Sequence, residues 1–70
     1  MDPRTLYLRM EKLQRQFESP TENIEQSLET LTNALLSVQD EFRNASGFTA
    51  IDPDYRTARL IYLTLRKYIT

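Results

Sequence analysis

Three carboxylates form the first group in this sequence that could do chemistry together. Glu22, Glu25 and Glu29 recur at intervals of three and four residues, which puts them on one face of a helix. Acid–base and metal sites most often include histidine or cysteine, and the 70 residues contain neither. We therefore interpret the glutamates as a solvated helix face, and we expect no catalytic residue, no metal site and no cofactor.

Four cations near the end of the chain form a second group, which could bind a phosphate or an acidic partner. They are Arg56, Arg59, Arg66 and Lys67. Proteins that bind nucleic acid through their charge are normally clearly basic, whereas the formal net charge here is −1. We do not expect nucleic acid to be the main partner. A small regulator that binds nucleic acid or a signalling protein through these cations is the alternative.

The sequence has no glycine-rich phosphate loop, no paired nucleophile and base, and no metal-ligand spacing. We therefore expect the protein not to be an enzyme. No apolar run approaches the roughly 20 residues of a membrane-spanning helix, and the first residues lack the basic-then-apolar plan of a signal peptide. These features predict a cytoplasmic protein.

Three prolines, each preceded by a residue typical of a helix N-cap, mark the starts of helices. The pairs are Asp2-Pro3, Ser19-Pro20 and Asp52-Pro53. Proline is tolerated at the first helical position because its missing N–H would have no partner there anyway. We predict helices over residues 3–18, 20–45 and 53–69, within a single all-α domain.

The second predicted helix carries specific signals at both ends. Ser19 and Glu22 fit a capping box, in which each side chain bonds the other residue's backbone N–H. Gly47, the only glycine, is expected to stop the helix, with Phe48 folding back towards the helix end. Because the apolar spacing keeps its phase across Ser19, a single rod kinked at the proline is the alternative to a turn there.

Apolar residues recur every three or four positions in the first two helices, which predicts one buried stripe on each. The stripes are Leu6, Met10, Leu13 and Phe17, and then Ile24, Leu28, Leu31, Leu35, Val38 and Phe42. The second stripe has the spacing of a coiled-coil seam. We predict a small three-helix antiparallel bundle, or a helical hairpin with an added helical arm, around a coiled-coil-like central seam.

The last helix combines a core face with two leucines outside it. At 100° per residue, Tyr55, Ala58, Ile61, Tyr62 and Leu65 share one broad arc, whereas Leu60 and Leu63 fall among the cations. The two leucines are either ordinary surface residues or part of a second apolar surface framed by cations. We predict that these seven residues bind a partner.

The chain is short for a self-sufficient core, and it has no cysteine with which to form a disulfide. Partner helices or self-association would then complete the core. The formal charge is +1 over residues 2–18, −4 over 19–50 and +2 over 51–70. This segregation suits antiparallel packing, although each exposed ion pair adds only about 0 to 1 kcal/mol.

The stretch DPDYRTARLIYLTL, which begins at Asp52, resembles the small co-chaperones of needle proteins in bacterial type III secretion. Their second helix opens with proline or a small residue, then tyrosine, then a run with alanine and paired isoleucines or leucines. The resemblance implies a helical scaffold that binds a second chaperone and keeps an aggregation-prone subunit soluble. The contact residues that it implies are Tyr55, Ala58, Ile61, Tyr62 and Leu65. Another family of helical hairpins, the small aspartyl-phosphate phosphatases of sporulating bacteria, has a Ser-x-x-Leu-Asp signature that this sequence lacks.

These observations predict a non-catalytic helical protein–protein interaction module, a small adaptor or secretion-type co-chaperone that uses apolar helix faces. The expected partner is another protein, such as a helical chaperone or a secreted subunit, or a second copy of the chain. A regulator that acts through the basic face of the last helix and a structural homo-oligomer are the alternatives.

Overall fold

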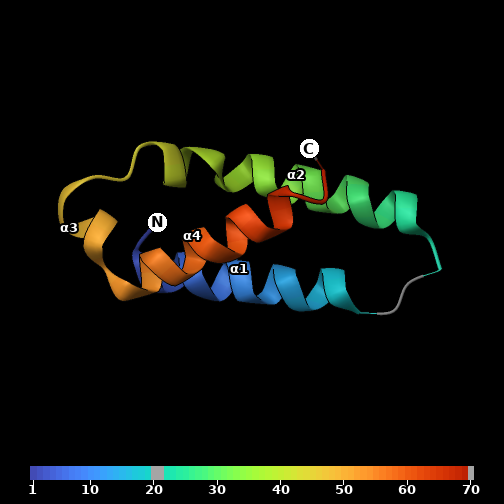
Figure 1. The fold of residues 1–70 in the computed structure, drawn as a ribbon, viewed down its shortest axis with the longest axis horizontal. Coiled ribbons are helices and arrows are strands. Elements are labelled where there is room, and N and C mark those ends of the chain that lie inside the picture. Colours follow the sequence, from blue (N-terminus) through green and yellow to red (C-terminus); the bar gives the residue numbers. More distant parts are fainter. Residues whose placement is uncertain (20–21, 70) are drawn as a thin grey trace.

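The computed structural model describes residues 1–19 and 22–69, and these are mainly helical, without a strand. The helices are α1 (Pro3–Glu18), α2 (Ile24–Arg43), α3 (Gly47–Ile51) and α4 (Pro53–Arg66). The three long helices form an up-down-up bundle, 41 Å long and 18 × 17 Å across, in which α2 runs antiparallel to α1 and α4 (Figure 1). The predicted all-α class is confirmed, and the arrangement is the bundle.

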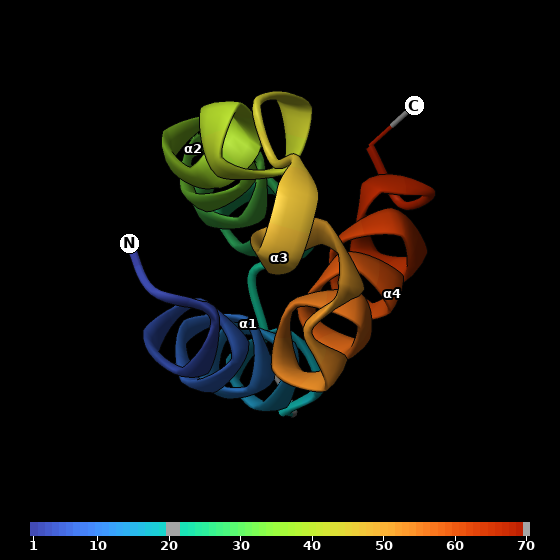
Figure 2. The same ribbon diagram turned by 90° about the vertical axis from the view of Figure 1, so that its left-hand side faces the viewer.

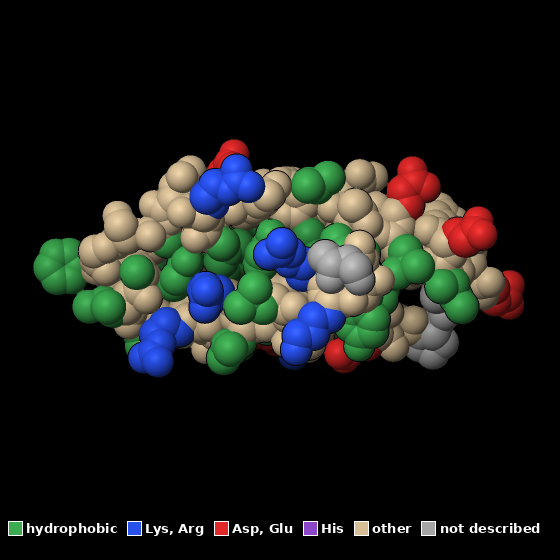
Figure 3. All heavy atoms as spheres, turned by 45° about the horizontal axis from the view of Figure 1, so that its top comes forward, with side chains coloured by type: hydrophobic (Ala, Val, Ile, Leu, Met, Phe, Trp, Pro, Cys, Tyr) green, Lys and Arg blue, Asp and Glu red, His purple; other side chains and the backbone are tan. Residues whose placement is uncertain are grey.

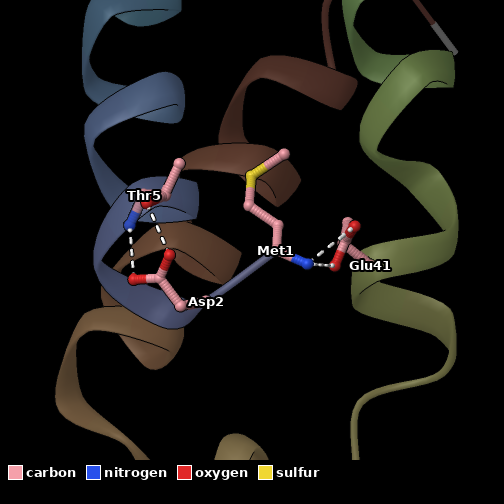
Figure 4. Close-up of polar contacts among 4 residues, drawn as sticks. All are labelled: Met1, Asp2, Thr5 and Glu41. Atoms are coloured by element: carbon pink, nitrogen blue, oxygen red, sulfur yellow. Dashed lines mark hydrogen bonds and ion pairs between the residues drawn. The ribbon is translucent and has the colours of Figure 1, made fainter.

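α1 begins at the predicted cap. The carboxylate of Asp2 accepts hydrogen bonds from the backbone N–H and the hydroxyl of Thr5, at 3.2 and 2.6 Å (Figure 4). These bonds satisfy a donor that the first helical turn leaves unpaired, and proline follows at the first helical position. The terminal amino group of Met1 donates to the Glu41 carboxylate at 3.4 Å, so the start of α1 lies beside the end of α2.

Ser19 ends α1 and does not start the next helix. Its N–H and its hydroxyl both donate to the carbonyl oxygen of Arg15, at 3.1 and 2.8 Å. The predicted capping box of Ser19 with Glu22 is wrong, because Ser19 is the C-cap of α1 and the N-cap of α2 is Asn23. Pro20, the predicted first residue of the second helix, lies outside the described residues. α1 and α2 are separate antiparallel helices, which excludes the single kinked rod (Figure 1).

α2 begins at Ile24, four residues later than predicted. The side-chain oxygen of Asn23 accepts a hydrogen bond from the N–H of Gln26 at 2.9 Å, so Asn-x-x-Gln is the cap that forms. The sequence analysis did not identify Asn23 as a helix start. The helix starts later than predicted because an antiparallel pair needs the intervening residues to reverse the direction of the chain.

α2 ends at Arg43, where the N–H of Asn44 donates to the carbonyl oxygen of Asp40 at 3.0 Å. Gly47 has a φ of +59°, a left-handed conformation that glycine adopts without steric cost. The prediction that Gly47 ends the second helix is therefore wrong. Gly47 instead begins the short helix α3, which the sequence analysis did not predict.

Phe48 lies on α3 and is 90% exposed. The expectation that it folds back onto the end of the second helix is therefore wrong. α3 crosses one end of the bundle and directs the chain from α2 into α4 (Figure 2). It contributes no buried residue to the core.

Asp52 ends α3 and caps α4 as predicted. Its carboxylate accepts bonds from the N–H groups of Asp54 and Tyr55, at 2.8 and 3.4 Å. The helix ends at Arg66, three residues before the predicted end. Residues 67–69 form a turn whose N–H groups donate to carbonyls three residues back, a tighter pattern than that of an α-helix.

The core combines one stripe from each long helix. Its buried residues are Leu6, Met10, Leu13, Leu31, Leu35, Val38, Tyr55, Ala58, Tyr62 and Leu65. Among the described residues, no polar or charged side chain other than tyrosine is buried. Apolar packing therefore holds the helices together, at about 1.5–3 kcal/mol for each large side chain fully removed from water.

α4 packs along α1 in the same direction, and more extensively than it packs on α2. Near the two helix starts, the guanidinium of Arg4 lies 3.4 Å from the carboxylate of Asp54. Near the two helix ends, the ring centroids of Phe17 and Tyr68 are 4.8 Å apart. α4 also meets α2 on its other side, so the three long helices surround a common axis (Figure 2).

Phe42 joins the end of α2 to α4. Its ring stacks on that of Tyr62, with centroids 4.6 Å apart, and lies 5.7 Å from that of Tyr55, whose hydroxyl donates to the Phe42 carbonyl at 3.3 Å. The other end of the apolar stripe of α2 is uncovered by α4, because α4 stops alongside the middle of α2 (Figure 1). Ile24, at that end of the stripe, is 67% exposed. In the part of the chain that is described, no helix has both the length and the apolar character needed to cross a membrane.

Candidate interaction surfaces of α4

The seven predicted partner-binding residues of α4 separate into a buried set and an exposed set. Tyr55, Ala58, Tyr62 and Leu65 are buried, Ile61 and Leu63 are half-buried against the core, and Leu60 is 65% exposed. A partner that approaches the folded bundle can reach Leu60 directly and the half-buried pair in part. The four buried residues hold the bundle together.

Leu63 lies at the seam between α2 and α4, in a hollow of about 220 Å³. The other residues that line this hollow are Gln39, Phe42, Arg43, Arg59, Tyr62 and Arg66. The helical wheel placed Leu63 among the cations, on the side of α4 opposite its core face. α4 is covered on two sides, by α1 and by α2, so a leucine far from the α1 side can still pack against the core.

Leu60 lies near the middle of α4, on a side of the helix that borders α3. It lines a hollow of about 390 Å³ with Ala50, Tyr55, Arg56 and Arg59. On α3, Phe48 and Ile51 are 90% and 67% exposed, and their spacing of three residues puts them on one side of the helix. We call Phe48, Ile51 and Leu60 the corner patch. Hydrophobic side chains gather at this end of the molecule, on the left of Figure 3.

The four predicted cations are all exposed, but they do not form a single group. Arg56 lines the corner hollow, Arg66 lines the seam hollow, Arg59 lines both, and Lys67 lies in the turn after α4. Arg43 adds a cation from α2 at the seam. Each hollow therefore combines apolar side chains with arginine.

Glu22, Glu25 and Glu29 are all exposed, but only Glu25 and Glu29 lie on α2, because Glu22 precedes its N-cap and so does not share their helix face as predicted. Within residues 1–19 and 22–69, no three acidic, histidine or cysteine side chains lie close enough together to hold a metal ion. The hydrogen bond from Thr5 lowers the pKa of Asp2, and the hydrogen bond to Glu11 raises the pKa of Tyr7. Neither of these two groups lines the seam hollow or the corner hollow.

Sequence reasoning missed the contributions of α3 and of Arg43. A signal for Phe48 and Ile51 was present, since both lie between two predicted helices and belong to neither apolar stripe. Large apolar residues in such a segment have no core position to fill. Arg43 was missed because its neighbours on α4 are distant in the sequence.

No family model, curated protein or solved structure matches the chain.

Proposed function

We propose that the protein is a non-catalytic helical interaction module, a small adaptor or co-chaperone, that binds a partner protein through the corner patch. The observation that carries this proposal is the exposure of three large apolar side chains, Phe48 at 90% and Ile51 at 67% on α3 and Leu60 at 65% on α4, where Leu60 shares a hollow with Ala50 of α3. Single exposed apolar residues are ordinary, whereas clusters of them mark contact surfaces.

The corner patch could contribute substantially to binding. Complete burial of a phenylalanine, leucine or isoleucine side chain gains about 1.5–3 kcal/mol relative to exposure. Phe48 makes the largest contribution, because almost all of its side chain is in water in the free chain. α3 contributes nothing to the buried core, so its apolar side chains are available to a partner without unfolding.

The cations beside Leu60 indicate the chemistry of the partner. Arg56 and Arg59 line the same hollow as Leu60, so an apolar side chain can enter while acidic side chains bond the guanidinium groups. A helix that carries leucine or phenylalanine flanked by aspartate or glutamate fits this arrangement. A nucleic acid, the alternative partner, would bind the cations and leave Leu60 and its apolar neighbours in water.

The resemblance to the type III secretion co-chaperones suggests a helical chaperone or a secreted subunit as the partner. Four of the five contact residues that it implies are buried in the bundle: Tyr55, Ala58, Tyr62 and Leu65. In a folded bundle, the exposed neighbours of these residues would make the contact instead. We therefore propose Leu60 and α3 as the binding surface for a partner of this kind.

Site-specific photo-crosslinking tests the proposal. A photoreactive residue replaces Phe48 in cells that express the protein, and the same residue replaces Leu8, a 50% exposed leucine of α1, as the matched control. We expect a defined protein to crosslink at position 48 and not at position 8. Crosslinking that is absent at position 48, or equal at the two positions, would count against the corner patch.

The captured protein is then purified and its affinity measured by calorimetry. Leu60→Gln should weaken binding at least tenfold, which corresponds to about 1.4 kcal/mol, because it puts a polar amide into an apolar contact. Leu8→Gln should leave the affinity unchanged. Equal affinities for all three proteins would contradict the proposal, and binding of a labelled DNA or RNA duplex that is lost in Arg56→Glu would favour the nucleic-acid alternative.

A further inference from the structure

A second stripe runs along α2 beside its core stripe. It consists of Glu25, Glu29, Thr32, Leu36, Gln39 and Arg43. Each of these residues comes one position after a residue of the predicted core stripe, so the second stripe lies about 100° around the helix. None of its six residues is buried. We call it the edge stripe.

The edge stripe changes from acidic to apolar to basic along α2. It starts with two glutamates, has Leu36 near its middle at 60% exposure, and ends at Arg43. Arg59 and Arg66 line the seam hollow with Arg43 and extend the basic end onto α4. Figure 3 shows this distribution on one face, with acidic side chains at the right, over the start of α2, and cationic side chains over the centre and left.

The charged residues of the edge stripe have no ion-pair partner within residues 1–19 and 22–69. The ion pairs found among the described residues do not include Glu25, Glu29 or Arg43. An acidic group and a basic group on one exposed edge are therefore both available to a second molecule.

We propose that the chain forms a two-fold symmetric dimer, in which the edge stripes of two copies pair antiparallel. Glu29 and Arg43 are each seven residues from Leu36, so pairing centred on Leu36 sets Glu29 of each copy opposite Arg43 of the other. If one copy slides along the other by one helical turn, Glu25 of each copy instead lies opposite Arg43 of the other, so opposite charges still meet. The two Leu36 side chains meet near the axis and remove each other from water.

The occupant is a second copy because the edge stripe is complementary to itself. When two copies are related by a two-fold axis, the acidic end of each edge stripe lies against the basic end of the other. The same contact forms twice, and the assembly closes at two chains. Parallel pairing would instead set acidic groups against acidic groups and arginine against arginine, which is unfavourable. The edge stripe contains no residue of the corner patch, so this inference does not depend on the proposed function.

Charge reversal on the full chain tests the dimer. Sedimentation velocity over a concentration series gives the mass and the dissociation constant of the unaltered protein, of Arg43→Glu, and of the double variant Glu25→Lys with Glu29→Lys. Arg9→Glu, an exposed substitution on α1 with the same change of charge, is the control. Circular dichroism of each variant establishes that it remains helical, and Leu36→Gln replaces any variant that does not.

We expect a dimer of the unaltered protein, and at least a tenfold weaker dimer for each charge-reversed protein alone, because like charges then meet at both contacts. A mixture of the two charge-reversed proteins should recover a tight dimer, since every contact between them is again between opposite charges. A monomer at all concentrations, a larger assembly, equal effects of Arg43→Glu and Arg9→Glu, or no recovery in the mixture would each overturn the proposal.

Discussion

Leu60 and Leu63 lie one helical turn apart on α4, both among arginines in the sequence, yet they belong to different regions. Leu63 lies at the seam, where α2 covers α4 and the aromatic rings of Phe42 and Tyr62 lie beside it. Leu60 lies at the corner, where α3 leaves the side chain 65% exposed. The comparison shows that the number of helices around a residue decides its environment, and that one helical wheel cannot give this number.

The largest expected effect is at the seam. Tyr62→Ala removes a buried ring that stacks on Phe42 and leaves a cavity, so it should lower the free energy of unfolding by about 3 kcal/mol. A domain of this size has a total stability of about 4–10 kcal/mol, so much of it would be lost. Urea denaturation followed by circular dichroism measures the change. A loss below about 1 kcal/mol would mean that the seam is not part of the core.

A smaller difference separates the two leucines themselves. Leu63→Gln should destabilise the bundle by about 1 kcal/mol, because it places an amide against the core, whereas Leu60→Gln should change stability by less than about 0.5 kcal/mol. The same urea titration compares the two variants. If Leu60→Gln and Leu63→Gln lowered the free energy of unfolding equally, the two leucines would not differ in environment.

The smallest effect involves neither region. The Thr5 hydroxyl lowers the pKa of Asp2 below its ordinary value of 3.8, so the carboxylate cap stabilises the fold above that value. This stability is lost as the pH falls through the lowered pKa of the folded state. Asp2→Asn, which can still cap α1, should therefore lose less stability than the unaltered protein on acidification.

Unfolding midpoints measured between about pH 5 and about pH 2 test this prediction. The substitutions Leu60→Gln and Leu63→Gln should leave the Asp2 effect unchanged, since distant sites contribute additively. A pH profile of Asp2→Asn identical to that of the unaltered protein would contradict a role of the carboxylate.

The starts of two helices were predicted correctly, because an aspartate followed by proline is by itself a strong signal for a helix N-terminus. Asp2 and Asp52, each followed by proline, cap α1 and α4 as expected. The helical class and the buried parts of the stripes also follow from periodicity, because an amphipathic helix needs its apolar face covered.

The start of the second helix was predicted at Ser19-Pro20, whereas Asn23 is the cap that forms. Where the helix starts depends on how many residues the chain needs to reverse direction, which is a property of the packed pair. The environment of Leu63 and the exposure of Phe48 likewise depend on where α2 and α3 lie relative to α4. Periodicity within a single segment contains no information on these positions.

Cysteine variants test most directly whether Leu63 belongs to a covered seam and Leu60 to an open corner. The chain has no cysteine, so the thiols introduced by Leu60→Cys and Leu63→Cys are each the only one present. Labelling rates with a thiol reagent, compared with those in denaturant, measure the exposure of each position. We expect a labelling rate at position 60 close to that of the unfolded chain, and a rate several-fold slower at position 63. Equal rates at the two positions in the folded protein would contradict the difference between the covered seam and the open corner.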